Sequence, residues 1–481
     1  MSAELARIGG AVACLGLATL MIARPRAFRV GGLIAWAAGA AALAGYLVPS
    51  GHHRLYTAGA VAGLVFAVAL ALVLRRWQWA LPALVLACAP VRIPVHVGGT
   101  DANLLLPLYA VVAAAAIVFA TELAVGEGRG RELGRIAWPL GALVAWTGLS
   151  LLWTNDLRQG AITLLFFILP FGLIAVMLAR LPWDPRWLTW LFVQLVAMAV
   201  AFAIVGIYQW ANRDVFWNPK VIVGNAYAPF FRVNSVFYDP SVYGRFLVIA
   251  ITACLVVALH SRAARVAYAA GAAIVVIWIG LLFSFSQSSF GALIAVVLVI
   301  AAIVWHWRAA AALVLVGALL LSAGVAAPRI RSTIIRHSHA GLNHATSGRA
   351  KLVINGVKIA VHHPILGVGV GGFKRAYADQ VGLRGRDPKS AASHDTPVTV
   401  AAETGLTGLV LFGWLVATGL SITLRRVPRT FAGRASLVFG LGFAAIAVHS
   451  LFYNAFFEDP TTWGLLALGA LAARQRETET E

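Results

Sequence analysis

The sequence predicts an all-α polytopic integral membrane protein, and three observations support this prediction. Hydrophobic residues make up 60% of the 481-residue chain, whereas charged residues make up only 12%. The apolar residues gather in runs close to the length of a helix that crosses a bilayer, about 20 residues. The basic residues fall between these runs. This composition lies outside the range of soluble domains.

The apolar runs, taken in order, predict about 12–15 membrane-spanning helices. Some of these runs are short, notably the first and the fourth. A single early Arg7 and the absence of a small-residue cleavage site favour a retained first helix over a removed signal peptide. The runs cover residues 8–23, 30–48, 56–74, 77–90, 103–121, 137–153, 160–179, 187–211, 242–259, 266–284, 289–306, 309–327, 396–424, 434–453 and 459–473.

Arginines in alternate connections predict the orientation of these helices. Short loops rich in Lys and Arg stay on the cytoplasmic side of a membrane. The arginines concerned are Arg24, Arg26, Arg29, Arg75, Arg76, Arg129, Arg131, Arg135, Arg180, Arg186, Arg262, Arg265, Arg425, Arg426, Arg429 and Arg434. The two long connections, 212–241 and 328–395, then lie together outside the cytoplasm.

The connection 328–395 carries eleven Lys or Arg residues against three Asp. Because the positive-inside rule does not explain basic residues on an outer loop, we infer that this loop binds an anion. Ser347 can cap an interfacial helix that ends near His362. Its predicted apolar stripe is Val353, Val357 and Ala360, opposite Lys351, Asn355, Lys358 and His362. The glycine-rich stretch 367–372 predicts a tight turn.

The net charge of +20 does not indicate nucleic acid binding, because no basic domain interleaved with aromatic residues is present. Anionic lipid and a phosphorylated substrate are the expected partners. The three cysteines have no paired spacing, so neither a disulfide nor a cysteine metal site is expected. The cluster His337, His339 and His344 lacks accompanying carboxylates, so no metal or other cofactor is predicted.

Two outer arginines, Arg232 and Arg245, flank a short turn before a predicted helix. Guanidinium groups keep their charge and bind phosphate oxygens through paired hydrogen bonds, which suits a diphosphate at a membrane surface. The alternative is contact with lipid headgroups. Arg349, near the start of the predicted loop helix, is a further candidate because a helix N-terminus adds positive potential. Lys351 contributes to the same attractive field.

His394 lies at a junction between loop and helix, where an imidazole can accept a proton near neutral pH. Glu403 follows on the same predicted helix. A carboxylate at this depth is costly unless it is paired, so we expect it to orient His394 or an arginine, or to form a structural ion pair. The neighbours Ser393 and Asp395 cannot complete a hydrolase triad with His394, because consecutive residues do not converge on one point.

Several ordered motifs together resemble the O-antigen ligase and O-antigen polymerase superfamily. These motifs are Ser-Gly-Arg at 347–349, His-His-Pro-Ile-Leu-Gly-Val-Gly-Val-Gly-Gly-Phe at 362–373, Ser-His-Asp at 393–395 and Ala-Glu-Thr-Gly-Leu-Thr-Gly-Leu-Val-Leu-Phe at 402–412. The segment from Arg232 to Arg245 resembles the arginine- and proline-containing outer loop of that family, with Asp239, Pro240 and Ser241 at its turn. The similarity covers about residues 205–425.

The resemblance implies an inverting, metal-independent transfer of a glycan from an undecaprenyl diphosphate carrier to an acceptor hydroxyl on lipid A core or on a growing glycan. It implies diphosphate binding by Arg232 and Arg349, and a role for His394 on the acceptor. It also implies a bacterial inner-membrane location with the site facing the periplasm or the cell exterior. Whether the enzyme is a ligase or a polymerase stays open.

Three regions follow from these assignments. Residues 1–205 form N-terminal membrane helices, 206–425 form the catalytic region with the outer loops 212–241 and 328–395, and 426–481 form C-terminal helices and a cytoplasmic tail. The alternatives are a transporter or flippase of lipid-linked oligosaccharides, in which the arginines only bind, and a peptidoglycan-type polymerase, which would rely on an outer carboxylate.

The chain departs from the family pattern at two places. Relatives have Asn after the histidine, whereas this chain has Asp395, which could raise the proton affinity of His394 or cap the next helix. Relatives often show Ser-Arg-Gly near a helix start where this chain has Ser-Gln-Ser-Ser-Phe-Gly at 286–291. The cation expected there is absent, so the other arginines must bind the donor.

Overall fold

The computed structural model describes residues 2–48, 53–97, 100–126, 132–227, 230–326, 349–382, 393–424 and 430–480. Within these ranges the chain is mainly helical, with one antiparallel hairpin formed by β1 (Ile93–Val97) and β2 (Thr100–Leu104). Eleven helical segments of the described chain are long and apolar enough to cross a membrane. The prediction of an all-α polytopic membrane protein is therefore confirmed.

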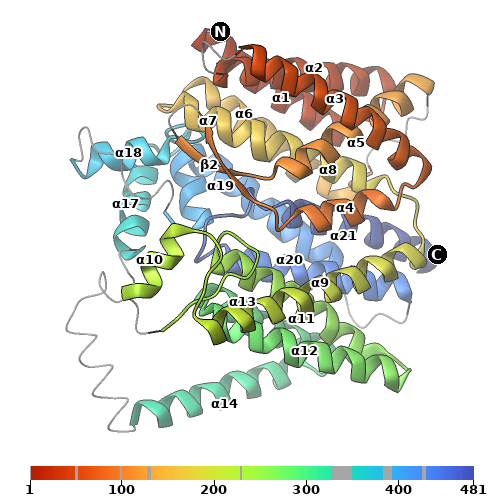
Figure 1. Ribbon diagram of the computed structural model, residues 1–481, viewed down its shortest axis with the longest axis vertical. Coiled ribbons are helices and arrows are strands. Elements are labelled where there is room, and N and C mark those ends of the chain that lie inside the picture. The colour runs from red at the N-terminus through yellow and green to blue at the C-terminus, as the bar shows by residue number, and fades with distance from the viewer. Residues whose placement is uncertain are drawn as a thin grey trace.

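The N-terminal helices form one packed group (Figure 1). In chain order they are α1 (Ala3–Ile22), α2 (Arg26–Leu47), α3 (His53–Arg76), α4 (Ala80–Cys88), α5 (Leu106–Val125), α6 (Ala137–Leu149), α7 (Leu157–Thr163) and α8 (Leu169–Ala179). Single turns η1 (Gly134–Ile136) and η2 (Ser150–Leu152) flank α6, and the π-helical turn η3 (Leu164–Ile168) joins α7 to α8. The predicted run 77–90 forms only the short α4.

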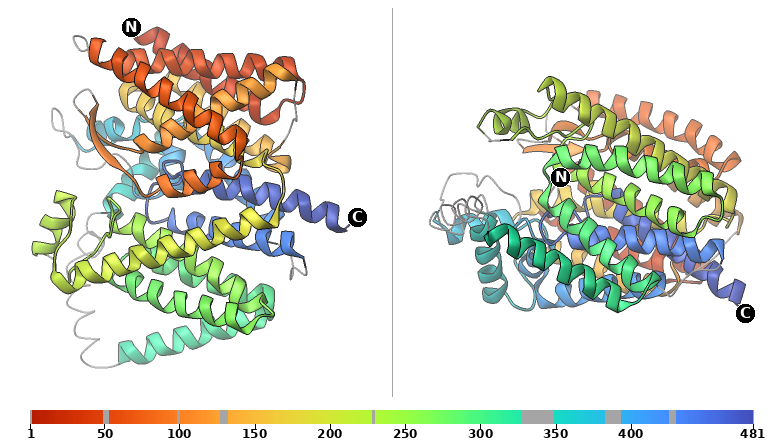
Figure 2. Two further views of the ribbon diagram at one scale, coloured as in Figure 1. Left: turned by 45° about the vertical axis from the view of Figure 1, so that its right-hand side comes forward. Right: turned by 90° about the horizontal axis from the view of Figure 1, so that it is seen from below.

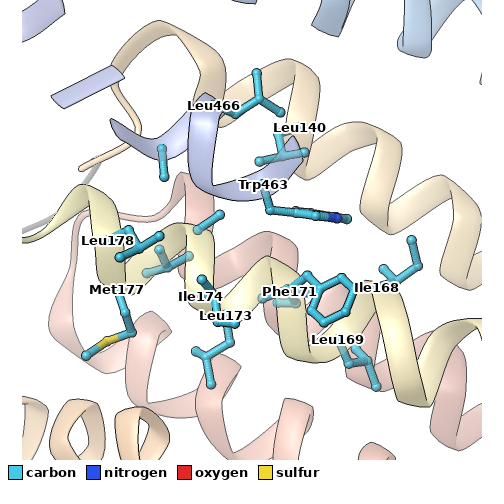
Figure 3. Packing of buried hydrophobic residues seen from close by; sticks show 14 of the residues in the cluster. Leu140, Ile168, Leu169, Phe171, Leu173, Ile174, Met177, Leu178, Trp463 and Leu466 are labelled. Carbon is cyan, nitrogen blue, oxygen red and sulfur yellow. The ribbon is translucent and has the colours of Figure 1, made fainter. Parts of the chain in front are cut away.

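A second group contains α9 (Pro185–Asn212), α11 (Pro240–His260), α12 (Ala264–Ser284) and α13 (Gln287–Val304), followed by α14 (Trp307–Ala326). Three C-terminal helices, α19 (Thr396–Thr423), α20 (Phe431–His449) and α21 (Pro460–Thr480), connect the two groups: α19 packs on α6, α21 on α8, and α20 on α11 and α13. Figure 3 shows Leu466 of α21 beside Leu140 of α6, and Trp463 of α21 between Leu140 and Phe171 of α8.

The arginine-rich connections gather at one end of the bundle, as their alternation predicts. Arg180 after α8 pairs with Glu122 of α5 at 2.7 Å and with Glu132 in the next connection. Arg29 of α2 pairs with the same Glu132 at 2.8 Å. Arg474 near the C-terminus donates to the carbonyl oxygen of Ala179 at 2.7 Å. Connections far apart in sequence therefore share this end.

The opposite end carries the outer elements α10 (Pro219–Tyr227), α17 (Arg349–His362) and α18 (Phe373–Gln380) (Figures 1 and 2). The predicted loop helix is present as α17, and Ser347 lies outside the described residues. The face of α17 that packs on the protein differs from the predicted apolar stripe. Asn355, Gly356 and Ile359 are buried, whereas Val357 is 47% exposed. Glycine is required at position 356, because a Cβ there would lie 2.6 Å from the side chain of Val398 and 3.1 Å from that of Phe373.

The predicted glycine-rich turn is an inserted loop that closes a break in α19. Gly405, at φ 70° and ψ −172°, interrupts that helix and frees backbone groups on either side. The loop pairs them: the N–H groups of Val368 and Gly369 donate to the carbonyl oxygens of Ala402 and Glu403, and Pro364 accepts from Leu406 at 2.7 Å. Buried backbone polar groups at membrane depth need such partners.

Candidate active site

Arg232 lies in the connection between α10 and α11, and its neighbours fix its backbone and side chain. The amide of Asn225 accepts from the backbone N–H of Arg232 at 3.0 Å and donates to its carbonyl oxygen at 2.9 Å. The Arg232 guanidinium is half-buried, and its Nε donates to the carbonyl oxygen of Ser284 at 3.2 Å. These contacts hold the guanidinium at the end of α12.

His394 stands at the same end, immediately before α19. It adopts a left-handed conformation with φ 65°, which is unfavourable for a residue with a Cβ by about 1–2 kcal/mol. The buried Ser393 hydroxyl donates to the carbonyl oxygen of Asp395 at 2.7 Å and bonds with the hydroxyl of Thr399. Strained residues held in this way cluster at functional sites.

Asp395 caps α19, which is one of the two roles that its sequence position allowed. Its carboxylate accepts from the backbone N–H of Val398 at 2.9 Å. The N–H of Thr396 donates to the carbonyl oxygen of Ser450 at 2.9 Å, so the start of α19 is tied to the end of α20. The position of His394 is therefore fixed on its C-terminal side by two separate contacts.

Arg349, the half-buried first residue of α17, completes a cluster with Arg232 and His394. Burial lowers the pKa of His394, the charge of Arg349 lowers it further, and Asp239 raises it. Burial likewise lowers the pKa of Arg232, Asp239 raises it and Arg349 lowers it. The charge of Arg349 thus acts on both Arg232 and His394, so the structure places the three predicted residues near one another at this end of the bundle.

Asp239 is a site residue that the sequence analysis placed only at a turn. It caps α11, where its carboxylate accepts from Ser241 N–H at 2.6 Å, and its charge also reaches Arg232, His394 and Tyr453. Burial raises the pKa of the Tyr453 phenol, and Asp239 raises it further. The Asp-Pro cap signature was visible in the sequence, but nothing in the sequence reported its distance from His394.

Arg245 requires a correction, because it is buried and paired with a carboxylate rather than placed at the membrane surface. It is only 1% exposed inside α11, and its guanidinium forms an ion pair with Asp459, the residue before α21. The sequence placed the helix start near residue 242, which left Arg245 at the membrane surface. The Asp239 cap and Pro240 start α11 at residue 240, so Arg245 lies in the second turn of the helix, within a run of buried residues.

Glu403 and Lys351 also differ in placement from Arg232. The Glu403 carboxylate accepts from the backbone N–H of Phe373 at 3.3 Å and from that of Gly371. It therefore supports the glycine-rich loop and orients neither His394 nor an arginine among the described residues. Lys351 is exposed in the first turn of α17.

The serine-rich segment at the start of α13 lies beside Arg232 and forms a buried network. Ser286 bonds with the hydroxyls of Ser288 at 3.1 Å and Ser289 at 2.8 Å, and Ser288 bonds with His449 Nε2 at 3.0 Å. Among the described residues, no group of three or more His, Cys, Asp and Glu side chains is placed to hold a metal ion. His337, His339 and His344 lie outside those residues.

Comparison with known proteins bears on this arrangement. Residues 272–413 match a family model described as O-antigen ligase, which confirms the family resemblance found in the sequence motifs. A comparison with curated proteins found no match. The matched segment includes Arg349, His394 and Glu403, while Arg232 precedes it. The protein therefore has the helices of a multi-pass membrane protein, and its segment 272–413 is similar to the O-antigen ligase family, which supports a membrane enzyme that transfers glycans.

Proposed function

We propose that the protein transfers a glycan from a polyprenyl diphosphate carrier, of the undecaprenyl type, to the hydroxyl of an acceptor. The observation that carries this proposal is the position of Arg232, Arg349 and His394 at one end of the bundle, where the charge of Arg349 acts on both of the other residues. These residues come from three separate segments and meet at the end of the bundle opposite the arginine-rich connections. The proposed location is a bacterial inner membrane, with this end facing the periplasm or the cell exterior.

Arg232 and Arg349 would bind the diphosphate of the donor. When the anomeric carbon–oxygen bond breaks, the bonding electrons leave with the diphosphate, and the two guanidinium groups stabilise the added negative charge. Arginine suits this role because it remains charged even where burial lowers its pKa. Since the leaving group is already a stable anion, no general acid is required.

His394 would act as the general base on the acceptor. The acceptor oxygen attacks the anomeric carbon from the side opposite the diphosphate and inverts its configuration, while the hydroxyl proton passes to the imidazole. His394 must be neutral to accept this proton. Burial and the charge of Arg349 favour the neutral imidazole at pH 7, because they lower its pKa from an ordinary value of about 6.5.

The catalytic region in this proposal is residues 206–425, with the helices of 1–205 and 426–481 as its scaffold. The acceptor is either a lipid A core, which makes the enzyme a ligase, or a growing glycan, which makes it a polymerase. Lys351 lies near the proposed entrance on α17 and would attract the anionic carrier without binding it specifically.

A carboxylate-dependent glycan polymerase is a second candidate because of one observation. Asp239 is an outer carboxylate whose charge reaches His394 and Arg232, so it could itself take the proton from an acceptor. Against this, the Asp239 carboxylate already accepts a hydrogen bond from the backbone N–H of Ser241 and is held as the cap of α11.

Reconstitution in proteoliposomes with a polyprenyl diphosphate glycan, candidate acceptors and a chelator tests the proposal. His394→Asn is the best variant at that position, because Asn tolerates the left-handed conformation. We expect it to lower transfer by about 10²–10⁴-fold, and Arg232→Gln to lower it by about 10²–10³-fold. Arg213→Gln is the matched control: Arg213 lies nearby but stacks on Trp210.

Three further outcomes would distinguish the alternative functions. Asp239→Asn keeps a capping side chain, so full loss of transfer in this variant with activity retained in His394→Asn would support the carboxylate-dependent polymerase. Movement of the glycolipid across the membrane without bond formation would support a flippase. Transfer to lipid A core and not to a second carrier-linked glycan would assign a ligase.

A further inference from the structure

A second site lies away from the candidate active site, in a cavity between the two helical groups. The cavity has a volume of about 780 Å³ and is lined mainly by aliphatic and aromatic side chains of α9, α11, α20 and α21, with contributions from α4 and α8. Arg232, Arg349 and His394 are not among the residues that line it. Its volume lies within the range of ligand pockets, about 300–1,000 Å³.

The cavity has a cationic end and an apolar end. Arg262, just after α11, and Arg434, in the first turn of α20, line it at the end that holds the arginine-rich connections, beside His260. Neither guanidinium forms an ion pair with a carboxylate in the described part of the chain. Towards its other end the cavity is lined by Phe246 and Pro460. In the sequence these residues directly follow Arg245 and Asp459, which form the buried ion pair.

This polarity selects among possible occupants. A large apolar cavity does not hold ordered water, and in a bilayer the abundant apolar ligand is a lipid chain. Two arginines without carboxylate partners at a cavity mouth attract a phosphate group, and basic pockets between helices on the cytoplasmic side bind anionic headgroups. The glycan donor is a poor fit, because its diphosphate would lie at the opposite end of the bundle.

We propose that this cavity binds one anionic phospholipid of the cytoplasmic leaflet. Its phosphate would lie between Arg262 and Arg434, and an acyl chain would extend along α11 and α21 towards Phe246. The chain would fill the space between the two helical groups and so couple α9 and α11 to α8 and α21. This lipid is distinct from the donor and from the acceptor, and its site rests on the geometry of the cavity alone.

Native mass spectrometry of the detergent-solubilised protein tests this proposal, with palmitoyl-oleoyl phosphatidylglycerol and the phosphatidylcholine of the same chains as probes. We expect one phosphatidylglycerol to bind about tenfold more tightly than phosphatidylcholine, since each cation near a headgroup contributes modestly. The double variant Arg262→Gln/Arg434→Gln should lose this preference. Arg265→Gln is the matched control, because Arg265 is exposed in α12 and does not line the cavity.

A second variant tests the acyl-chain part. Gly464 lines the cavity, and a Cβ there would have only Leu178 within contact, at 3.8 Å, so Gly464→Leu fills the space without forcing the backbone apart. We expect it to abolish tight binding while raising the melting temperature of the lipid-free protein. Equal binding of both lipids by the wild type would overturn the proposal. So would undiminished phosphatidylglycerol binding in Gly464→Leu, or one-for-one displacement of phosphatidylglycerol by undecaprenyl phosphate, which would assign the cavity to an isoprenoid chain.

Discussion

Two arginines with similar sequence surroundings have different environments. Arg232 and Arg245 both stand in an outer segment close to a helix start, yet Arg232 faces the site, whereas Arg245 is buried against Asp459. The difference arises from where α11 begins. Asp239 followed by Pro240 is a helix-start signature, because Asp accepts from free N–H groups and proline suits the first turn. Hydropathy alone placed the start too late.

The buried pair gives a prediction for Arg245. Arg245→Met should lower the free energy of unfolding by about 3–5 kcal/mol, because it leaves the Asp459 carboxylate buried without a partner. The folded fraction should keep the wild-type KM for the donor. Thermal unfolding in detergent, together with donor titrations, measures both quantities. Adding Asp459→Asn should restore part of the lost stability, whereas a KM that rises with unchanged stability would return Arg245 to the diphosphate site.

At the scale of elements, the break in α19 and the glycine-rich loop form one unit. Gly367, Gly369 and Gly371 have positive φ values and press against the backbone of α19, Thr154 and Gly160 respectively. The sequence predicted a turn here from glycine content. It could not predict the docking, because the loop's hydrogen-bond partners lie in other elements, such as Ser150, which bonds to Val370 N–H at 3.1 Å.

Two glycine substitutions separate this docking from simple backbone strain. Gly369→Ala should destabilise the protein by about 3 kcal/mol, because its Cβ would overlap the Cα of Thr154 in addition to the cost of positive φ. Gly382→Ala is the control: Gly382 also has positive φ, 73°, but nothing lies within 4 Å of its Cβ position. Gly382→Ala should lower the free energy of unfolding by only about 1 kcal/mol. Equal melting temperatures for the two variants would contradict the docked loop.

The helix α17 shows why stripes of apolar residues can mislead at a protein surface. The sequence predicted an apolar stripe of Val353, Val357 and Ala360, whereas the face that packs on the protein contains Asn355 and Gly356. The amide of Asn355 is satisfied there, since its Nδ2 donates to the carbonyl oxygen of Lys351 and its Oδ1 accepts from Gln380. Ile354 and Val361 are exposed, which suits an interfacial helix, because the apolar face of such a helix contacts lipid instead of water.

At the scale of the whole molecule, the sequence predicted the class and the separation of the two ends. Apolar runs predict membrane helices because backbone N–H and C=O groups in lipid must form hydrogen bonds within the helix. The arginines between the runs predict which ends of the helices lie on the same side. The order of helices around the bundle was not predictable, because membrane helices are apolar on most sides. The joining of two groups through α19, α20 and α21 therefore had to come from the structure.

The candidate site was predictable in its members and not in its geometry. Arg232 and Arg349 stood out as guanidinium groups in the outer segments, and His394 as an imidazole at a junction between loop and helix. Asn225 and Asp239 did not stand out, since both read as ordinary capping or turn residues. Their roles depend on contacts across the fold: Asn225 holds both backbone groups of Arg232, and Asp239 reaches His394.

The dependence of transfer on pH tests most directly whether these residues act as one site. The acid limb of kcat/KM for the donor reports the pKa of the essential base in the free enzyme. In the wild type this limb should lie below pH 6.5, because burial and Arg349 lower the pKa of His394. Transfer should fall as the pH drops through that pKa, since the protonated imidazole cannot accept the acceptor's proton.

The decisive measurement compares this limb in wild type, Arg349→Gln and Asp239→Asn proteoliposomes. Removing the Arg349 charge should raise the pKa of His394 and move the limb to higher pH, whereas removing the Asp239 charge should move it to lower pH. Opposite displacements are the predicted result. Limbs that coincide in all three proteins would show that His394 is not the essential base or that these charges do not share its site, and would contradict the account.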